Sequence, residues 1–182
     1  MFRQIRPGFA PGLVAATLFA WGCERPATPA SPKPSFSDGT GSCAAGERFT
    51  GGGRIDPLGG KTTFGFNVDA EDWCRSGGPI KGQLQTVWHP PHTLIHSLTI
   101  DEFFSFDDPE GRGGRCAAFT GLARVKDGNG SWVQEHFGAV ACDNGEPGSS
   151  PGRGPDRYGI SLKESGRESD VVDLTGGNIQ AH

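Results

Sequence analysis

The sequence predicts an all-β protein, an antiparallel β-sandwich of the jelly-roll or immunoglobulin-like kind with about eight strands. Glycine (30) and proline (14) are so frequent among the 182 residues that they would interrupt nearly every long helix. From position 47 onward, short apolar or alternating runs recur about every 8–12 residues between glycine, proline and acidic clusters. No window of about 11 residues shows sustained helical spacing of apolar side chains. These observations exclude a long helical bundle and indicate an antiparallel sandwich or barrel rather than a parallel α/β sheet; of the two, we expect the sandwich.

The first half of the folded region contains four expected strands. They are the segments 48–55, 62–68, 80–88 and 92–100. Phe64 and Phe66 lie two positions apart in the second segment, so they share one face of that strand. The third segment would bury Leu84 together with either Val87 or Trp88, depending on its register.

The fourth segment is the richest in apolar side chains. Alternation places Ile95 on one side of it and four side chains on the other: Leu94, His96, Leu98 and Ile100. Segment 103–106 either continues this strand or forms a short one of its own. The remaining strands are expected at 116–125, 132–141, 158–162 and near 178–181.

The strongest turn signal in the chain is Lys-Asp-Gly-Asn-Gly at 126–130. A hairpin centred on Asn129 places residues equidistant from it directly opposite each other, and Cys116 and Cys142 are equidistant. Opposed residues come close enough for a disulfide. Cys43 would then pair with Cys74, although four cysteines allow three pairings. The alternatives are free thiols or a metal site, and the lack of any Cys-x-x-Cys spacing disfavours the metal.

Residues 1–22 have the layout of a lipoprotein signal peptide. Arg3 and Arg6 precede an apolar stretch, 9–21, that is too short to span a bilayer. The sequence Ala-Trp-Gly-Cys that ends at Cys23 resembles a bacterial lipobox, in which the cysteine receives lipid. Lipidation of Cys23 would also leave an even number of cysteines for disulfides. The alternative is ordinary signal cleavage nearby, with Cys23 as a chance thiol.

The rest of the chain divides into a linker and one domain. Residues 23–42 form a Pro/Ser-rich linker that is expected to be disordered and extended. Residues 43–182 suit a single β-sandwich domain with one core. We therefore expect an exported protein of the bacterial cell envelope, anchored to a membrane through lipid on Cys23 and facing the periplasm or the surface. The net charge of −4 disfavours a nucleic-acid partner.

Several stretches, taken in order, resemble the domains named post-COAP. The first are Gly-Gly-Gly-Arg-Ile-Asp (51–56), Gly-Lys-Thr-Thr-Phe-Gly-Phe-Asn-Val (60–68), Gly-Gln-Leu-Gln (82–85) and Ile-His-Ser (95–97). The later ones are Asp-Asn-Gly-Glu-Pro-Gly (143–148), Asp-Arg-Tyr-Gly-Ile (156–160) and Gly-Gly-Asn-Ile-Gln-Ala-His (176–182). The resemblance covers about residues 49–182. It implies an exported bacterial β-domain attached to surface proteins, with no established activity or ligand.

Two groups of side chains are candidates for metal binding. Asp143, Glu146 and Asp156 are a weak candidate for Ca²⁺, because carboxylates are hard oxygen ligands. Turn chemistry explains Asp-Asn-Gly and Glu-Pro-Gly as well, and we prefer it. Four histidines, at positions 89, 92, 96 and 136, suggest zinc, but no His-Glu-x-x-His motif accompanies them.

The favoured function is that of a lipid-anchored surface or envelope protein whose non-catalytic β-domain has a structural or binding role. One alternative is a carbohydrate- or protein-binding module that uses exposed aromatic side chains, drawn from Trp73, Trp88, Trp132 and Tyr158. It requires Trp73 or Trp88 to be exposed in one patch. Another alternative, a metal-dependent hydrolase, requires the carboxylates or histidines to converge in a cleft. No catalytic residue and no cofactor is assigned.

Overall fold

The structure is a computed structural model that describes residues 47–57, 60–90, 92–145 and 154–182. The predicted signal peptide (1–22), Cys23 and the linker (23–42) lie outside the described residues, as do Cys43 and Glu146. In the described part of the chain, no helix has the length and apolar character needed to cross a membrane.

The described chain forms nine strands and one short helix. In order, they are β1 (Arg48–Ile55), β2 (Lys61–Asp69), α1 (Glu71–Ser76), β3 (Lys81–His89), β4 (Thr93–Ser97), β5 (Glu102–Asp107), β6 (Arg115–Asp127), β7 (Val133–Asp143), β8 (Arg157–Leu162) and β9 (Glu168–Ala181). Adjacent strands pair antiparallel throughout, which confirms the predicted all-β class. Helix α1 was not predicted, because six residues are too few for a periodic pattern of apolar side chains.

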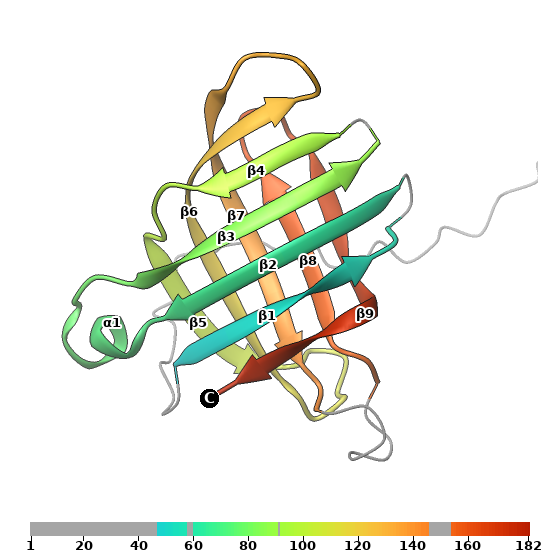
Figure 1. Cartoon of the computed structure of the whole chain (residues 1–182). Coiled ribbons are helices and arrows are strands. Elements are labelled where there is room, and N and C mark those ends of the chain that lie inside the picture. The colour runs from blue at the N-terminus through green and yellow to red at the C-terminus, as the bar shows by residue number, and fades with distance from the viewer. Residues whose placement is uncertain (1–46, 58–59, 91, 146–153) are drawn as a thin grey trace, which may run out of the picture. The chain divides into compact units, whose positions relative to one another are not determined.

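The strands close into an eight-stranded barrel. Their order is β4-β3-β2-β1-β9-β8-β7-β6, and β6 pairs back to β4. Figure 1 shows β1–β4 in front and β6–β8 behind, as two sides of this one closed sheet, with the end of β9 in front beside β1. The predicted sandwich is therefore wrong, because the two sides are joined by strand pairing rather than packed as separate sheets. Closure removes the unpaired edges that a sandwich would leave.

β6 is long enough to pair with two strands along the same side. Its residues 123–127 pair with β4, and residues 115–120 pair with β5. Between the two strands, the amides of Leu98 and Asp101 donate to carbonyls of β6, at 2.7 and 2.8 Å. Gly121 allows this close approach, since a Cβ there would collide with the Thr99 carbonyl oxygen. Segment 103–106 is thus a separate strand that continues along the same neighbour.

The central hairpin has the predicted register. β6 and β7 pair so that Cys116 lies opposite Cys142, and the two form a disulfide. Both sulfurs belong to a small apolar cluster on the outside of the barrel, with Ala118 and Val140. Cys74 is also disulfide-bonded, whereas Cys43, its predicted partner, lies outside the described residues.

The strand faces follow the predicted alternation in β2, β3 and β4, but the sequence left the inner face of β4 open. Phe64 and Phe66 are buried as predicted, and the register of β3 buries Trp88 rather than Val87. In β4 it is Ile95 that is fully buried, while Leu94 and His96 are half-buried on the other face; Ile100, beyond the end of β4, is buried in the core. Because both faces of this segment carry apolar side chains, alternation alone does not identify the inner one.

Aromatic side chains fill the interior of the barrel. Phe64 stacks on Tyr158 with ring centroids 3.8 Å apart, and Phe66 lies 5.4 Å from Phe119. The Tyr158 hydroxyl is within 2.9 Å of the Thr86 hydroxyl, which satisfies its polar atom in the core. Burial raises the pKa of Tyr158 far above its ordinary value, so its hydroxyl stays protonated. The interior is therefore a packed core.

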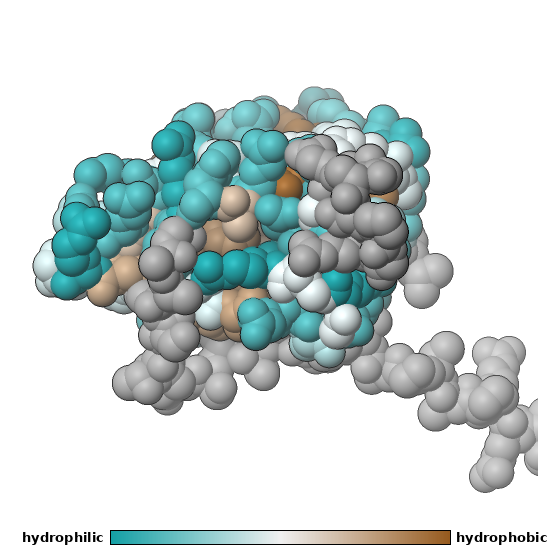
Figure 2. All heavy atoms as spheres, turned by 90° about the horizontal axis from the view of Figure 1, so that it is seen from below, coloured by the Kyte–Doolittle hydropathy of each residue, from teal (hydrophilic) through white to brown (hydrophobic). Residues whose placement is uncertain are grey.

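Hydrophilic side chains dominate the surface seen in Figure 2, which views the molecule from below Figure 1. Hydrophobic residues appear there only as small, separate areas. This is the expected result when alternation directs apolar side chains into a closed barrel.

Candidate functional site

A groove crosses the outer face of β2, β3 and β4, the strands nearest the viewer in Figure 1. Its volume is about 710 Å³. The exposed or half-buried polar residues that line it are Thr63, Asn67, Gln83, Gln85, His96, Ser97 and Arg124. No carboxylate lines the groove among the described residues.

Strand register aligns the central side chains of this groove in one row. Gln85 of β3 lies opposite His96 of β4, His96 lies opposite Arg124 of β6, and Arg124 lies opposite Gln134 of β7. Directly opposed residues of antiparallel strands point to the same side of the sheet. Four planar, hydrogen-bonding side chains from four strands thus stand side by side on the outer surface.

Glycines occupy the next two positions of this row, on β2 and β1, so no side chain projects from the sheet there. Gly65 of β2 lies opposite Gln85 on one side and Gly52 of β1 on the other. A Cβ at Gly65 would meet no atom within 4 Å, so packing does not require a glycine there. Glycine in a strand interior weakens the strand and often marks a place where another molecule approaches the backbone closely. The result is a floor of bare backbone beside a row of polar side chains.

Trp132 stands at the β6–β7 end of the row and is 43% exposed. The Arg124 guanidinium carbon lies 4.9 Å from the centre of its ring, and Lys126 Nζ lies 6.0 Å away. The His96 ring meets Trp132 edge-on, with centroids 5.6 Å apart. These contacts hold an exposed indole against two cations at the end of the groove.

The groove is electropositive within an acidic chain. Arg124 and Lys126 make no ion pair with a carboxylate among the described residues, whereas Arg54, Lys81 and Arg167 each do. Desolvation, together with the charge of Arg124, lowers the pKa of His96 below its ordinary value. His96 is therefore neutral at pH 7 and can either donate or accept a hydrogen bond.

A second hollow, of about 420 Å³, lies at one mouth of the barrel beside Trp88 and Arg167. Here the Arg167 guanidinium bonds to Asp127 at 2.6 Å and lies 5.6 Å from the Trp88 ring centre. Hydrogen bonds from Thr93 and Arg167 lower the pKa of Asp127. Arg167, one of the cations at this mouth, is therefore already paired with carboxylates, unlike Arg124 in the groove.

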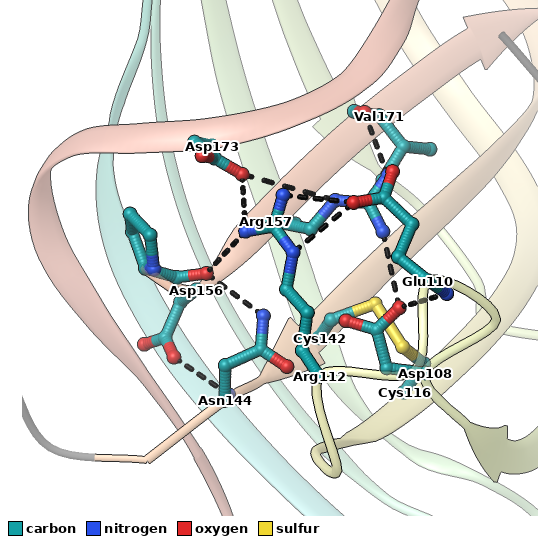
Figure 3. Close-up of polar contacts among 11 residues, drawn as sticks. Asp108, Glu110, Arg112, Cys116, Cys142, Asn144, Asp156, Arg157, Val171 and Asp173 are labelled. Carbon is teal, nitrogen blue, oxygen red and sulfur yellow. Dashed lines mark hydrogen bonds and ion pairs between the residues drawn. A yellow bond between two sulfur atoms is a disulfide. The ribbon is translucent and has the colours of Figure 1, made fainter. Parts of the chain in front are cut away.

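A buried ionic cluster lies beside the Cys116–Cys142 disulfide (Figure 3). Arg157 of β8 is 4% exposed, and its guanidinium contacts Asp108 at 3.2 Å and Glu110 at 2.5 Å. It also donates to the Val171 carbonyl at 3.2 Å. Arg112 joins Glu110 to Asp173, at 2.8 and 2.7 Å. The acids and guanidinium groups use one another as partners, so the cluster holds the loop after β5 against β8 and β9.

Two of the carboxylates proposed as Ca²⁺ ligands accept hydrogen bonds from backbone amides instead. Asp156 accepts hydrogen bonds from Asn144 N at 2.9 Å and from Ile179 N at 2.6 Å, one on each oxygen. Asp143 accepts from Gly145 N at 2.8 Å and from Ala181 N at 2.9 Å. Glu146 lies outside the described residues. Asp143 and Asp156 therefore tie the end of β7 to β9, as the turn interpretation favours.

Replacing Asp156 with alanine is expected to lower the free energy of unfolding by about 1–3 kcal/mol, because two buried amides lose charged acceptors. Denaturant unfolding of purified protein measures this loss. Asp170→Ala, at an exposed acid of β9, is the control and should change stability by less than about 0.5 kcal/mol. Equal losses in the two variants, or a rise in the wild-type unfolding temperature with Ca²⁺, would contradict this role of Asp156.

The other metal candidates do not form an ion site in the described part of the chain. Asp108, Cys116 and Cys142 lie within 4.8 Å of one another, but the two sulfurs are bonded to each other and offer no thiolate. His136 bonds to Glu164 at 2.7 Å, and His96 faces Trp132. The four histidines thus lack a common centre.

The predicted aromatic patch is not formed by the residues proposed for it. Trp88 and Tyr158 are buried, and Trp73 packs against the core, half-buried. Trp132 is the exposed member of the set. Gly65, Gln85 and Arg124 were not predicted as site residues, because only strand pairing aligns them in one row. The hairpin centred on Asn129 could have identified one of these contacts, since Arg124 and Gln134 are equidistant from it.

Comparisons with protein-family models, with curated proteins and with solved structures gave no match to this chain.

Proposed function

We propose that this protein is an exported, lipid-anchored protein of the bacterial cell envelope, and that its barrel is a non-catalytic carbohydrate-binding module. The observation that carries the binding role is the groove, with its backbone floor at Gly65 and its row of polar side chains, together with the exposed Trp132 that contacts Arg124 and His96 at its end. Kinship with the post-COAP domains is part of this proposal and rests on the ordered motifs of the sequence.

The chemistry of the groove suits a sugar chain. Sugars present hydroxyl groups around the ring and apolar C–H groups on its faces. Gln85 and Gln134 offer amides that both donate and accept hydrogen bonds, and Trp132 offers an apolar surface. A groove open along its length admits a polymer. In the described part of the chain, no carboxylate lines the groove for acid–base chemistry, which supports a binding role rather than hydrolysis.

The anchor is tested at the mature N-terminus. We expect mass spectrometry of the protein from bacterial membranes to show a chain that begins at Cys23 and carries acyl groups. Cys23→Ser should release the protein from the membrane fraction, because the acyl chains hold it there. Cleavage at another position, or membrane retention of Cys23→Ser, would contradict the proposed anchor.

Binding is tested by filling the floor of the groove. Gly65→Val should weaken binding of the purified full chain to polysaccharide at least tenfold (about 1.4 kcal/mol), because the new side chain occupies the place of the ligand. Folding should be unaffected, since Gly65 has open space at Cβ and valine favours strands. A panel of bacterial and plant polysaccharides in a pull-down, followed by titration, provides the measurement.

The control is Gly176→Val. Gly176 lies in β9 opposite Arg54, also has open space at Cβ, and does not line the groove. It should bind as the wild type does. If the wild type and both variants bind equally tightly, the polysaccharide-binding site does not lie in this groove. Failure of the wild type to bind any polysaccharide would overturn the binding function.

A further inference from the structure

The two cations at the end of the groove point to the class of sugar polymer. Arg124 and Lys126 lie two positions apart on β6, so both side chains rise from the outer face of the barrel. The outward residues around them are neutral: Leu94 and His96 of β4 and Gln134 of β7. The chain has a net charge of −4, yet Arg124, which lines the groove, and Lys126 beside it make no ion pair with a carboxylate among the described residues.

Trp132 fixes the position of these cations. The Arg124 guanidinium lies against the indole ring, which limits its rotamers while its N–H edge stays available. A guanidinium presents two parallel donors that match the two oxygens of a carboxylate. Lys126, within 6.0 Å of the same ring, supplies a second point charge. The site is thus organised for a carboxylate before the ligand arrives.

We infer that the groove binds an acidic polysaccharide, with uronic-acid carboxylates on Arg124 and Lys126 and neighbouring sugar rings over Gly65 and against Trp132. This inference rests on the proposed function and assigns its ligand class. A nucleic acid is also a polyanion, but the cationic surface here spans only two side chains in an acidic chain, which is far less than a phosphate backbone requires.

His96 provides an internal reporter for this ligand. It lies directly opposite Arg124, with Gln85 on its other side and Trp132 against its ring; Lys126 is the other charged group nearby. A carboxylate bound to Arg124 offsets the positive charge that now opposes protonation of His96. Saturation with the ligand should therefore move the NMR titration midpoint of His96 to higher pH.

The experiment compares two polymers that differ only at C6 of each sugar, which is a carboxylate in one and a neutral hydroxymethyl group in the other. Polygalacturonate and its carboxyl-reduced, neutral form are titrated into the full chain by calorimetry, at low and at physiological salt. We expect the acidic polymer to bind at least tenfold more tightly, with an affinity that falls as salt rises. Arg124→Gln combined with Lys126→Gln should lose this preference and still bind the neutral polymer.

The matched control is Arg48→Gln combined with Lys61→Gln, which removes two exposed cations outside the groove. It should keep the preference within about threefold. If the wild type binds the two polymers with equal affinity, the inference of an acidic ligand is wrong, while the groove still binds sugars. Tighter binding of a single-stranded oligonucleotide than of polygalacturonate would also overturn it. Wild-type protein that binds neither polymer and no other polysaccharide would overturn the proposed function as well.

Discussion

Replacing Arg157 with methionine is expected to lower the free energy of unfolding by about 3–5 kcal/mol, the largest effect of any single substitution considered for this protein. The side chain of Asp108 is 0% exposed, and Arg157 is its counter-ion at 3.2 Å. One Asp108 oxygen accepts the Glu110 amide at 2.8 Å, and the other has no partner among the described residues. Methionine has a similar length but no charge, so the carboxylate would stay buried and uncompensated.

The measurement is equilibrium unfolding in urea and by heat, and the unfolding temperature should fall by about 10 °C or more. Arg54→Met is the matched control, because Arg54 forms an exposed ion pair with Asp56, at 3.1 Å. Its loss should be below about 1 kcal/mol. Adding Asp108→Leu to Arg157→Met should recover much of the stability, since both charges are then gone. A double variant as unstable as Arg157→Met would show that the charge is not the cause.

Removing the Cys116–Cys142 disulfide has the second largest expected effect. Cys116→Ala combined with Cys142→Ala should lower the free energy of unfolding by about 3 kcal/mol, because the bridge closes a 26-residue separation in the unfolded chain. The two strands are already paired around this position, so the native register should persist. Circular dichroism checks the fold, and denaturant unfolding under non-reducing conditions measures the loss.

Val140→Ala separates the cross-link from the packing that surrounds it. Val140 belongs to the same apolar cluster, and its truncation should cost about 1–2 kcal/mol without changing chain connectivity. If the cysteine double variant loses no more than Val140→Ala, the bridge contributes packing alone and the chain-entropy account is wrong. A reducing agent should destabilise the wild type more than the double variant.

Local pattern predicted those parts of the fold that depend on neighbours in sequence. The hairpin followed from one turn signal, because a tight turn fixes which residues of its two arms are opposed. Burial of Phe64 and Phe66 followed from alternation in a strand with only one apolar side. The inner face of β4 did not follow, since Leu94 and Ile95 are both apolar and only packing selects between them.

The candidate site could not be predicted from the sequence for a related reason. Gly65, Gln85, His96 and Arg124 belong to four strands, and their row exists only because β3 pairs with β4 and β4 with β6. The β4–β6 pairing joins segments separated by the whole of β5, and no turn residue specifies it. The buried cluster around Arg157 also unites β8, β9 and the loop after β5. A buried arginine has no local signature, because its partners come from elsewhere in the chain.

The amino-acid sequence by itself determined the antiparallel β class, the position of most strands and the Cys116–Cys142 pairing. These depend on backbone preferences of glycine and proline, on a period of two, and on one turn. Only the tertiary structure decided that the sheet closes into a barrel and that the groove beside Trp132 forms. Closure depends on whether the backbone groups of the two edge strands pair with each other or stay exposed to water. These strands are far apart in the chain, so local sequence does not decide the outcome.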